Sequence, residues 1–167
     1  TLYLETLWKD KFSAQKNSNG IFYTADGEVS TEFMNETRTD VLHAGYGFYA
    51  YAKPLSVGGN MWFILPNEDA SVDGLLRNGY FMEYVMGIAP RFSKQYSINF
   101  SVPKFDVSSE ESIKEDVEKL GLSEIFDAAS ADFSPISKTP LYVDDITQGT
   151  RLLIDENGVI GGSYIVS

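Results

Sequence analysis

The sequence predicts an α+β fold dominated by β-strands, with mostly antiparallel sheets and a few short helices. Three observations predict it. Short apolar and aromatic runs are separated by turn-forming residue pairs, the apolar residues alternate with period two around residues 98–107, and helical spacing is confined to two stretches. A chain of 167 residues, 43% of them hydrophobic and 14% aromatic, suffices for one domain or part of a larger one. We therefore treat residues 1–167 as a single-domain fragment.

Strand signals dominate the first 66 residues. Residues 2–8 are rich in apolar and aromatic side chains, and residues 1–4 resemble the middle of a strand already under way, so we expect that an upstream segment has been removed. Residues 46–51 and 61–65 predict two paired strands, the second apolar on both faces and ended by Pro66. Turns between short strands are predicted at Asn19-Gly20, Asp26-Gly27 and Gly58-Gly59.

Two stretches have helical character. Residues 72–86 fit helical spacing loosely, with Gly74 and Gly79 interrupting, which predicts one or two short helices. Residues 108–120 give the clearest signal, because Ser108 and Glu111 have capping-box spacing and Gly121 follows where a left-handed cap belongs. An apolar stripe at i, i+4 and i+7 completes the pattern.

A change of parity marks the strand around Pro103. The apolar residues fall on even positions up to Val102 and on odd positions from Phe105 onwards. Because a shift of one residue turns the opposite side of a strand towards the core, this strand is expected to bend and pass from one sheet to another.

The end of the chain predicts two further strands. Residues 141–154 resemble a long strand with Ile146, Leu152 and Ile154 on one face. Residues 159–167 contain no charge and no proline and have strong β character at their end. An exposed segment of this kind is a template for strand pairing.

Composition excludes several classes of function. Thirteen Lys and Arg against 24 Asp and Glu give a net charge of −11, which repels nucleic acid and anionic membranes. No apolar run approaches the ~20 residues of a membrane helix. The absence of cysteine removes disulfides, thiolate zinc sites and cysteine nucleophiles.

The candidate chemical groups do not form a conventional active site. His43 is the only histidine, and we favour a structural role for it over that of a general base. Glu110-Glu111 and Asp144-Asp145 are adjacent pairs that cannot converge in a strand, which favours a solvated surface. Residues 155–158 lack calcium-loop spacing and predict a turn. No enzyme activity, metal or cofactor is expected.

Seven segments of the chain form a recognisable series when they are read in order. They are Trp8-x-x-x-Phe12, Phe33-Met34, Phe-Ile-Leu-Pro-Asn-Glu at 63–68, Val-Pro-Lys-Phe at 102–105, the helix of residues 112–121, residues 131–137 and Asp-Glu-Asn-Gly at 155–158. Together these segments resemble the serpin family of serine protease inhibitors. Val-Pro-Lys-Phe is similar to the family motif where a strand passes between sheets, in agreement with the change of parity.

The resemblance implies a partial serpin fold, with parts of the central sheet, the barrel-like second sheet and the small upper sheet. It implies a suicide-substrate inhibitor of a serine, or else a cysteine, protease. The protease cuts an exposed loop and becomes covalently attached, and the loop inserts as a new strand in the central sheet. The scissile bond, the N-terminal helical part and the last strands lie outside this sequence, so the remaining half of the chain is a partner.

The resemblance also assigns residues. Glu156 and Gly158 stand at the loop hinge, and Trp8 and Gln148 in the region where the sheet opens. Period two places four small or apolar residues on the inserted face: Val159, Gly161, Ser163 and Ile165. Burying the valine and the isoleucine would contribute roughly 1.5 to 3 kcal/mol each.

The hinge departs from the family pattern. Family members favour alanines and a threonine where residues 161–165 read Gly-Gly-Ser-Tyr-Ile, and an acidic residue is common where Ile160 stands. Gln148 replaces a frequent histidine and Thr6 a frequent glycine. These departures keep one alternative open: a non-inhibitory serpin that acts as a carrier or chaperone. A second alternative, a β-rich sugar-binding module, is suggested by the 23 aromatic residues of this acidic chain. The composition suits a secreted or cell-surface bacterial serpin, which we expect, and it would suit an intracellular one as well.

Overall fold

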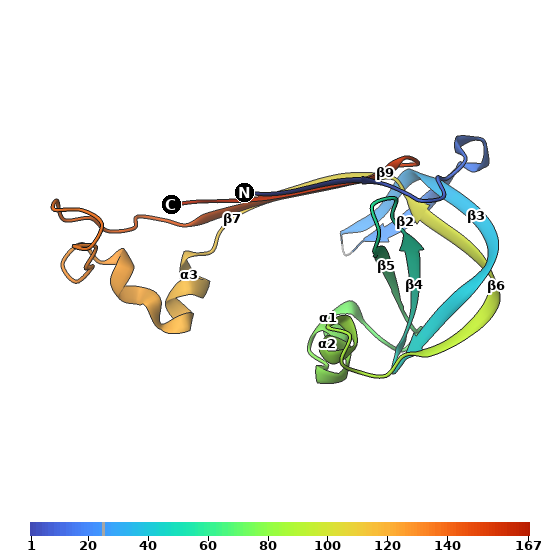
Figure 1. Cartoon of the computed structure of the whole chain (residues 1–167), viewed down its shortest axis with the longest axis horizontal. Helices are drawn as coiled ribbons and strands as arrows, with labels where there is room; N and C mark the ends of the chain where they lie inside the picture. Colours follow the sequence, from blue (N-terminus) through green and yellow to red (C-terminus); the bar gives the residue numbers. More distant parts are fainter. Residues whose placement is uncertain (25) are drawn as a thin grey trace. The chain divides into compact units, whose positions relative to one another are not determined.

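A computed structural model describes residues 1–24 and 26–167, which form two compact units (Figure 1). One unit contains residues 1–5, 105–154 and 159–167, and the other contains residues 6–104 and 155–158. Each unit is described by itself below.

The first unit is built on a four-stranded sheet. Its strands are β1 (Leu2–Leu7), β9 (Gly158–Val166), β8 (Thr147–Ile154) and β7 (Phe105–Ser112), in that order. The pairs β7–β8 and β8–β9 are antiparallel. A short helical segment follows β7 in Figure 1: α3 (Lys114–Val117), η2 (Glu118–Leu122) and η3 (Ser123–Phe126).

The register gives this sheet two unlike faces. Phe105, Ile154 and Val159 form one row across β7, β8 and β9, and Val107, Leu152 and Gly161 form another row on the same face. The opposite face carries the rows Asp106–Leu153–Ile160, Ser108–Arg151–Gly162 and Glu110–Gly149–Tyr164. One face is therefore apolar near Gly158, while the other carries charged side chains.

The second unit contains a five-stranded antiparallel sheet. The long β3 pairs with three other strands and so joins the sheet together. The elements are η1 (Ala14–Lys16), β2 (Ser18–Thr24), β3 (Gly27–Gly45), β4 (Phe48–Pro54), β5 (Asn60–Pro66) and β6 (Phe92–Pro103). Because β3 runs on for 19 residues, the two smaller sheets implied by the resemblance are continuous here.

Two short helices cover one end of β4 and β5 in the same unit: α1 (Val72–Leu76) and α2 (Gly79–Val85). The Ser71 and Asn78 side chains accept backbone N–H groups at their N-termini. The Phe48 ring meets the rings of Phe81 and Tyr84 edge to face, at centroid distances of 5.2 and 4.9 Å. The prediction of one or two short helices is confirmed. Within residues 1–24 and 26–167, no helix has the length and apolarity to span a bilayer.

The turn predictions are confirmed at two of three positions. Gly27 follows the turn at Asp26, and Gly58 and Gly59 have φ values of +93° and +78° between β4 and β5. The turn predicted at Asn19-Gly20 is wrong, because both residues lie inside β2 and pair with β3. At Gly20 a Cβ would lie 2.9 Å from the Phe33 ring, so the glycine makes room for that aromatic side chain.

The passage between sheets at Pro103 is confirmed. β6 ends at Pro103 as a partner of β3 in the five-stranded sheet, and β7 begins at Phe105 as a partner of β8 in the four-stranded sheet. The change of parity therefore reflects a real change of sheet.

The helix predicted over residues 108–120 is wrong in its first part. Residues 108–112 continue β7 and pair with β8, so the capping-box spacing of Ser108 and Glu111 has no cap to form. Long-range strand pairing outweighs the local helix signal there. The helix begins only at Lys114, and Gly121 has the expected positive φ of +92°.

The strand predicted over residues 141–154 is too long. β8 begins at Thr147, and residues 141–146, which include Ile146, have no strand partner. Their polar groups bind elsewhere, because Val143 N–H donates to Ile125 O at 2.9 Å and the Asp145 carboxylate accepts the Ser112 hydroxyl at 2.5 Å. Alternation alone did not reveal these competing bonds.

Candidate loop hinge

Trp8 holds the turn that precedes β9. Its side chain is buried, with 1% exposed, and its indole N–H donates to Asp155 O at 2.8 Å. Its backbone N–H donates to Asn157 O at 2.9 Å, and Phe12 N–H donates to Glu156 O at 3.2 Å. The turn over residues 155–158 is thus fixed by the segment that follows β1.

The turn is closed by its own first side chain. The Asp155 carboxylate accepts the backbone N–H groups of Asn157 at 2.7 Å and Gly158 at 3.0 Å. An aspartate that binds its own backbone in this way stabilises a tight turn. The carboxylate is occupied by the turn, as the sequence led us to expect. No group of acidic or histidine side chains in residues 1–24 and 26–167 could hold a metal ion.

Glu156 is one of two carboxylates in an ion cluster around Lys104. The Lys104 ammonium lies 2.6 Å from the Glu156 carboxylate and 2.7 Å from the Glu32 carboxylate. The Asn17 amide donates to both carboxylates, at 2.5 and 3.0 Å. The cluster therefore ties the hinge position to β3 and to the end of β6.

The cluster shifts the pKa values of its members. The hydrogen bond from Lys104 lowers the pKa of Glu156, and the same bond raises the pKa of Lys104. Because the folded pKa of Glu156 lies below its ordinary 4.5, its contribution to stability is present above that value and is lost as the pH falls through the folded pKa. The contribution of Lys104 is lost only as the pH rises through its own raised pKa.

Reversing the charge at position 156 should destabilise the protein. Glu156→Lys places two ammonium groups together, and we expect the free energy of unfolding of the full-length protein to fall by about 1 kcal/mol or more at neutral pH. The double variant Glu156→Lys with Lys104→Glu should recover part of the loss, because opposite charges face each other again. Urea unfolding at pH 7 measures both changes. Equal losses in the single and double variants would contradict the ion-pair explanation.

Gly158 is required by a close approach of backbones. A Cβ at this position would lie 2.0 Å from the carbonyl oxygen of Thr6 and 2.8 Å from Leu7 Cα. Both atoms belong to β1 and cannot rotate away as a side chain could. The buried Thr6 and Gly158 thus occupy adjoining positions, and only glycine fits the second of them.

Beside Trp8 lies a buried ion pair that the sequence analysis missed. Lys53 is fully buried, donates to both Glu36 carboxylate oxygens at 2.9 Å and lies 4.1 Å from the centre of the Phe12 ring. Removal of one member of such a pair leaves an uncompensated buried charge. The one signal in the sequence was a lysine inside the apolar run of β4.

In the first unit, the structure places the four residues assigned to the inserted face on one side of β9. Val159 is 3% exposed, Gly161 and Ser163 are half-buried, and Ile165 is 61% exposed. They lie opposite Ile154, Leu152, Thr150 and Gln148 of β8, respectively. Coverage of this face therefore decreases from Val159 towards the end of the strand.

Gln148 and Trp8 belong to different compact units. Gln148 lies in β8 between Glu111 of β7 and Ile165 of β9. Trp8 belongs with Glu156 and Gly158. The structure thus brings Trp8 together with Glu156 and Gly158, and it separates Trp8 from Gln148, with which the resemblance had grouped it.

The remaining candidates have structural surroundings. The His43 ring nitrogen Nδ1 lies 2.7 Å from the Ser93 hydroxyl, and burial followed by the nearby Arg91 charge lowers the pKa of His43. Glu110 and Glu111 point to opposite faces of β7, whereas Asp144 and Asp145 are exposed outside any strand. These contacts fit the structural roles that the sequence predicted.

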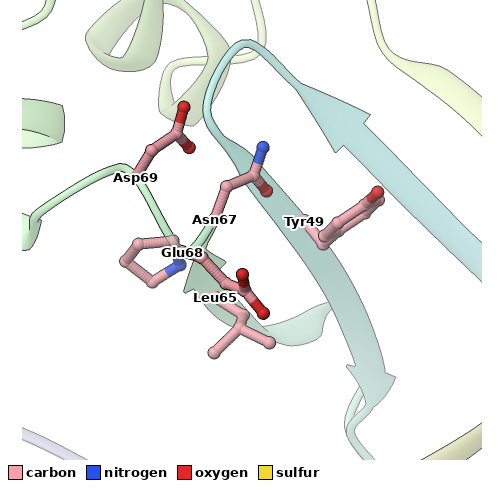
Figure 2. Close-up of a pocket in the computed structure, with 6 residues that line it drawn as sticks. Tyr49, Leu65, Asn67, Glu68 and Asp69 are labelled. Atoms are coloured by element: carbon pink, nitrogen blue, oxygen red, sulfur yellow. The ribbon is translucent and has the colours of Figure 1, made fainter.

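An open hollow of about 480 Å³ lies at the end of β5. Figure 2 shows Tyr49, Leu65 and the acidic side chains of Glu68 and Asp69 around it. Tyr49 and Leu65 are 48% and 68% exposed, so the hollow is an open feature of the surface. It includes part of the Phe-Ile-Leu-Pro-Asn-Glu segment, but no chemistry follows from its lining.

Residues 1–163 match the sequence model of the family Serpin (serine protease inhibitor), and the chain belongs to that family. Bovine antithrombin-III is 25% identical over 95% of this chain and 35% of its own length. A putative non-inhibitory serpin-10 of Oryza sativa subsp. japonica is 28% identical over 94% of this chain and 45% of its own length. The crystal structure of the thermophilic serpin tengpin in the latent state matches with a TM-score of 0.80 and 23% identity, over 98% of this chain and 45% of that one.

The chain therefore spans less than half the length of each of these three serpins. The match supports the strand-rich fold, with antiparallel sheets and few short helices, that the sequence predicted. It also assigns the chain to a family of protease inhibitors that bind target proteases.

Proposed function

We propose that this chain is the second half of a suicide-substrate inhibitor of serine-type endopeptidases. Residues 158–166 act as the part of the reactive loop that inserts into the central sheet. The target protease, serine or else cysteine in type, and the remaining half of the serpin chain are its partners. We place the protein outside the cell or on the cell surface, as a bacterial serpin.

One observation carries the proposal: β9 lies between β1 and β8 in the four-stranded sheet. A strand in the interior of a sheet binds neighbours along both edges, so the hydrogen-bonding groups of this uncharged segment are used on both sides. The hinge supports the same proposal, because Gly158 permits the close approach to β1 and Glu156 is held by Lys104.

A non-inhibitory carrier or chaperone is the second candidate. The putative non-inhibitory rice serpin has 28% identity with this chain, and the hinge departs from the alanine-rich family pattern at residues 161–165. A sugar-binding module is not favoured, because aromatic rings such as Phe48, Phe81 and Tyr84 pack against one another in the core.

Thermal unfolding before and after cleavage separates inhibitor from carrier. We expect that cutting the full-length protein beyond Ser167 raises its unfolding midpoint sharply, because the inserted segment adds a central strand. Circular dichroism on the intact and the cut protein measures the change. A mock digestion with inactivated protease is the control. An unchanged midpoint would remove the inhibitory function and leave the carrier.

A further inference from the structure

Tyr164 reaches across an entire strand of the four-stranded sheet. It lies on the face of β9 opposite Ser163, in the row formed with Gly149 of β8 and Glu110 of β7. Its hydroxyl donates a hydrogen bond to the Glu110 carboxylate, two strands away. A single side chain thus connects the last strand of the chain to β7, over the top of β8.

The ring of Tyr164 fills a gap that only glycine leaves open. A Cβ on Gly149 would lie 2.2 Å from Tyr164 Cζ and 2.3 Å from Cε1. Gly149 is buried because the Tyr164 ring covers it. Its neighbour Thr150 is exposed. An aromatic ring packed over a glycine of the adjacent strand shields backbone that would otherwise face water.

The gap over Gly149, which we call the seat of Tyr164, is available to the ring at one register of β9 against β8 only. A slip of one residue would turn Tyr164 to the other face of the sheet. A slip of two would bring it opposite Thr147 or Arg151, each of which carries a side chain on this face. The Arg151 guanidinium is moreover held by the Asp106 carboxylate through two bonds of 2.7 and 2.6 Å. Neither alternative offers room for the ring.

We propose that Tyr164 is a positioning residue that fixes the register of the inserting segment. The gap over Gly149 receives its ring, and Glu110 holds its hydroxyl. This inference rests on the proposed function, since the tyrosine can reach Gly149 only when residues 158–166 pair with β8. It anchors the segment to β8 at a position six residues beyond Gly158 and opposes withdrawal from the sheet.

Two alanine substitutions in the full-length protein test the seat. Gly149→Ala closes the gap, whereas Gly162→Ala, on the same face, places its Cβ 3.8 Å from the nearest atom and serves as the matched control. We expect Gly149→Ala to increase the hydrogen exchange rate of amides 158–166 about tenfold after cleavage. The fraction of protease trapped in an SDS-resistant complex should fall, while the uncut protein keeps its unfolding midpoint.

Variants at position 164 distinguish register control from simple packing. Tyr164→Ala should reproduce the effect of Gly149→Ala, and Tyr164→Phe, which keeps the ring and loses the hydroxyl, should fall between them and the wild type. In the Tyr164→Ala background, Gly149→Ala should have no further effect, because no ring remains to be displaced. A loss that adds fully in the double variant would overturn the role of Tyr164.

Hydrogen exchange after cleavage distinguishes a failure of the proposed function from a failure of the role of Tyr164 alone. If amides 158–166 of the wild type stay unprotected after cleavage, the segment does not insert, and both the proposed function and the role of Tyr164 are overturned. If the wild type becomes protected and Gly149→Ala behaves like Gly162→Ala, insertion stands and the role of Tyr164 alone is overturned.

Discussion

Gly161→Glu is expected to abolish stable protease complexes while the full-length protein remains a substrate of the same protease. Gly161 lies in one row with Leu152 of β8 and Val107 of β7, on the apolar face of the sheet. A carboxylate placed there without a partner costs several kcal/mol, so insertion of the segment becomes unfavourable. Gel electrophoresis in SDS measures the complex and the cut inhibitor together.

Two control variants separate the effect of the added charge from the effect of side-chain volume and from the choice of sheet face. Gly161→Ala adds only a Cβ, which would lie 3.9 Å from Leu152 Cδ1, and should leave complex formation intact. Gly162→Glu makes the same charge change one residue along, on the face that carries Arg151, and is expected to be tolerated. If Gly161→Glu still formed an SDS-resistant complex, the assignment of the apolar face would be wrong.

Gly158→Ala is expected to cancel much of the stability that cleavage adds. The new Cβ would meet the Thr6 carbonyl oxygen at 2.0 Å. The surrounding backbone cannot yield freely, because Trp8 N–H binds Asn157 O at 2.9 Å. Overpacking against fixed backbone costs about 1–3 kcal/mol.

Denaturant unfolding of the cut full-length protein measures this loss. Gly162→Ala is again the matched control, since its Cβ has 3.8 Å of room. A Gly158→Ala variant as stable after cleavage as the Gly162→Ala variant would show that β1 and the start of β9 do not approach as closely as described.

Patterns that depend on neighbouring residues in sequence could be predicted well. The turn at Gly58-Gly59 follows from the freedom of glycine to adopt positive φ, and the two short helices before Met86 follow from the local spacing of apolar residues. The change of sheet at Pro103 was visible as a change of parity, because strand alternation records which side is buried.

Features that depend on distant partners could not be predicted. Residues 108–112 have a good helix start, yet their pairing with β8 makes them strand. Residues 141–146 alternate like a strand, yet they have no strand to pair with. Local propensity amounts to a fraction of a kcal/mol per residue and is outweighed wherever a whole ladder of backbone hydrogen bonds competes.

The candidate site likewise has parts that could be predicted from the sequence and parts that could not. The resemblance placed Glu156 and Gly158 at a hinge and Trp8 in the region where the sheet opens. Nothing in the sequence indicated that Lys104 and Asn17 complete an ion cluster with Glu156, or that Lys53 is buried beside Trp8. Nor could Gly149 be recognised as the seat of Tyr164, because the two residues meet only across paired strands.

The sequence by itself determined the family, the β-rich class, the uncharged segment after Gly158 and the two faces that such a segment must have. These are properties of residue order and of the two-residue period of a strand. Only the tertiary structure decided which strands flank that segment, which carboxylates share Lys104 and where the ring of Tyr164 rests. Strand order and register are set by contacts between residues far apart in the chain, and no local pattern encodes them.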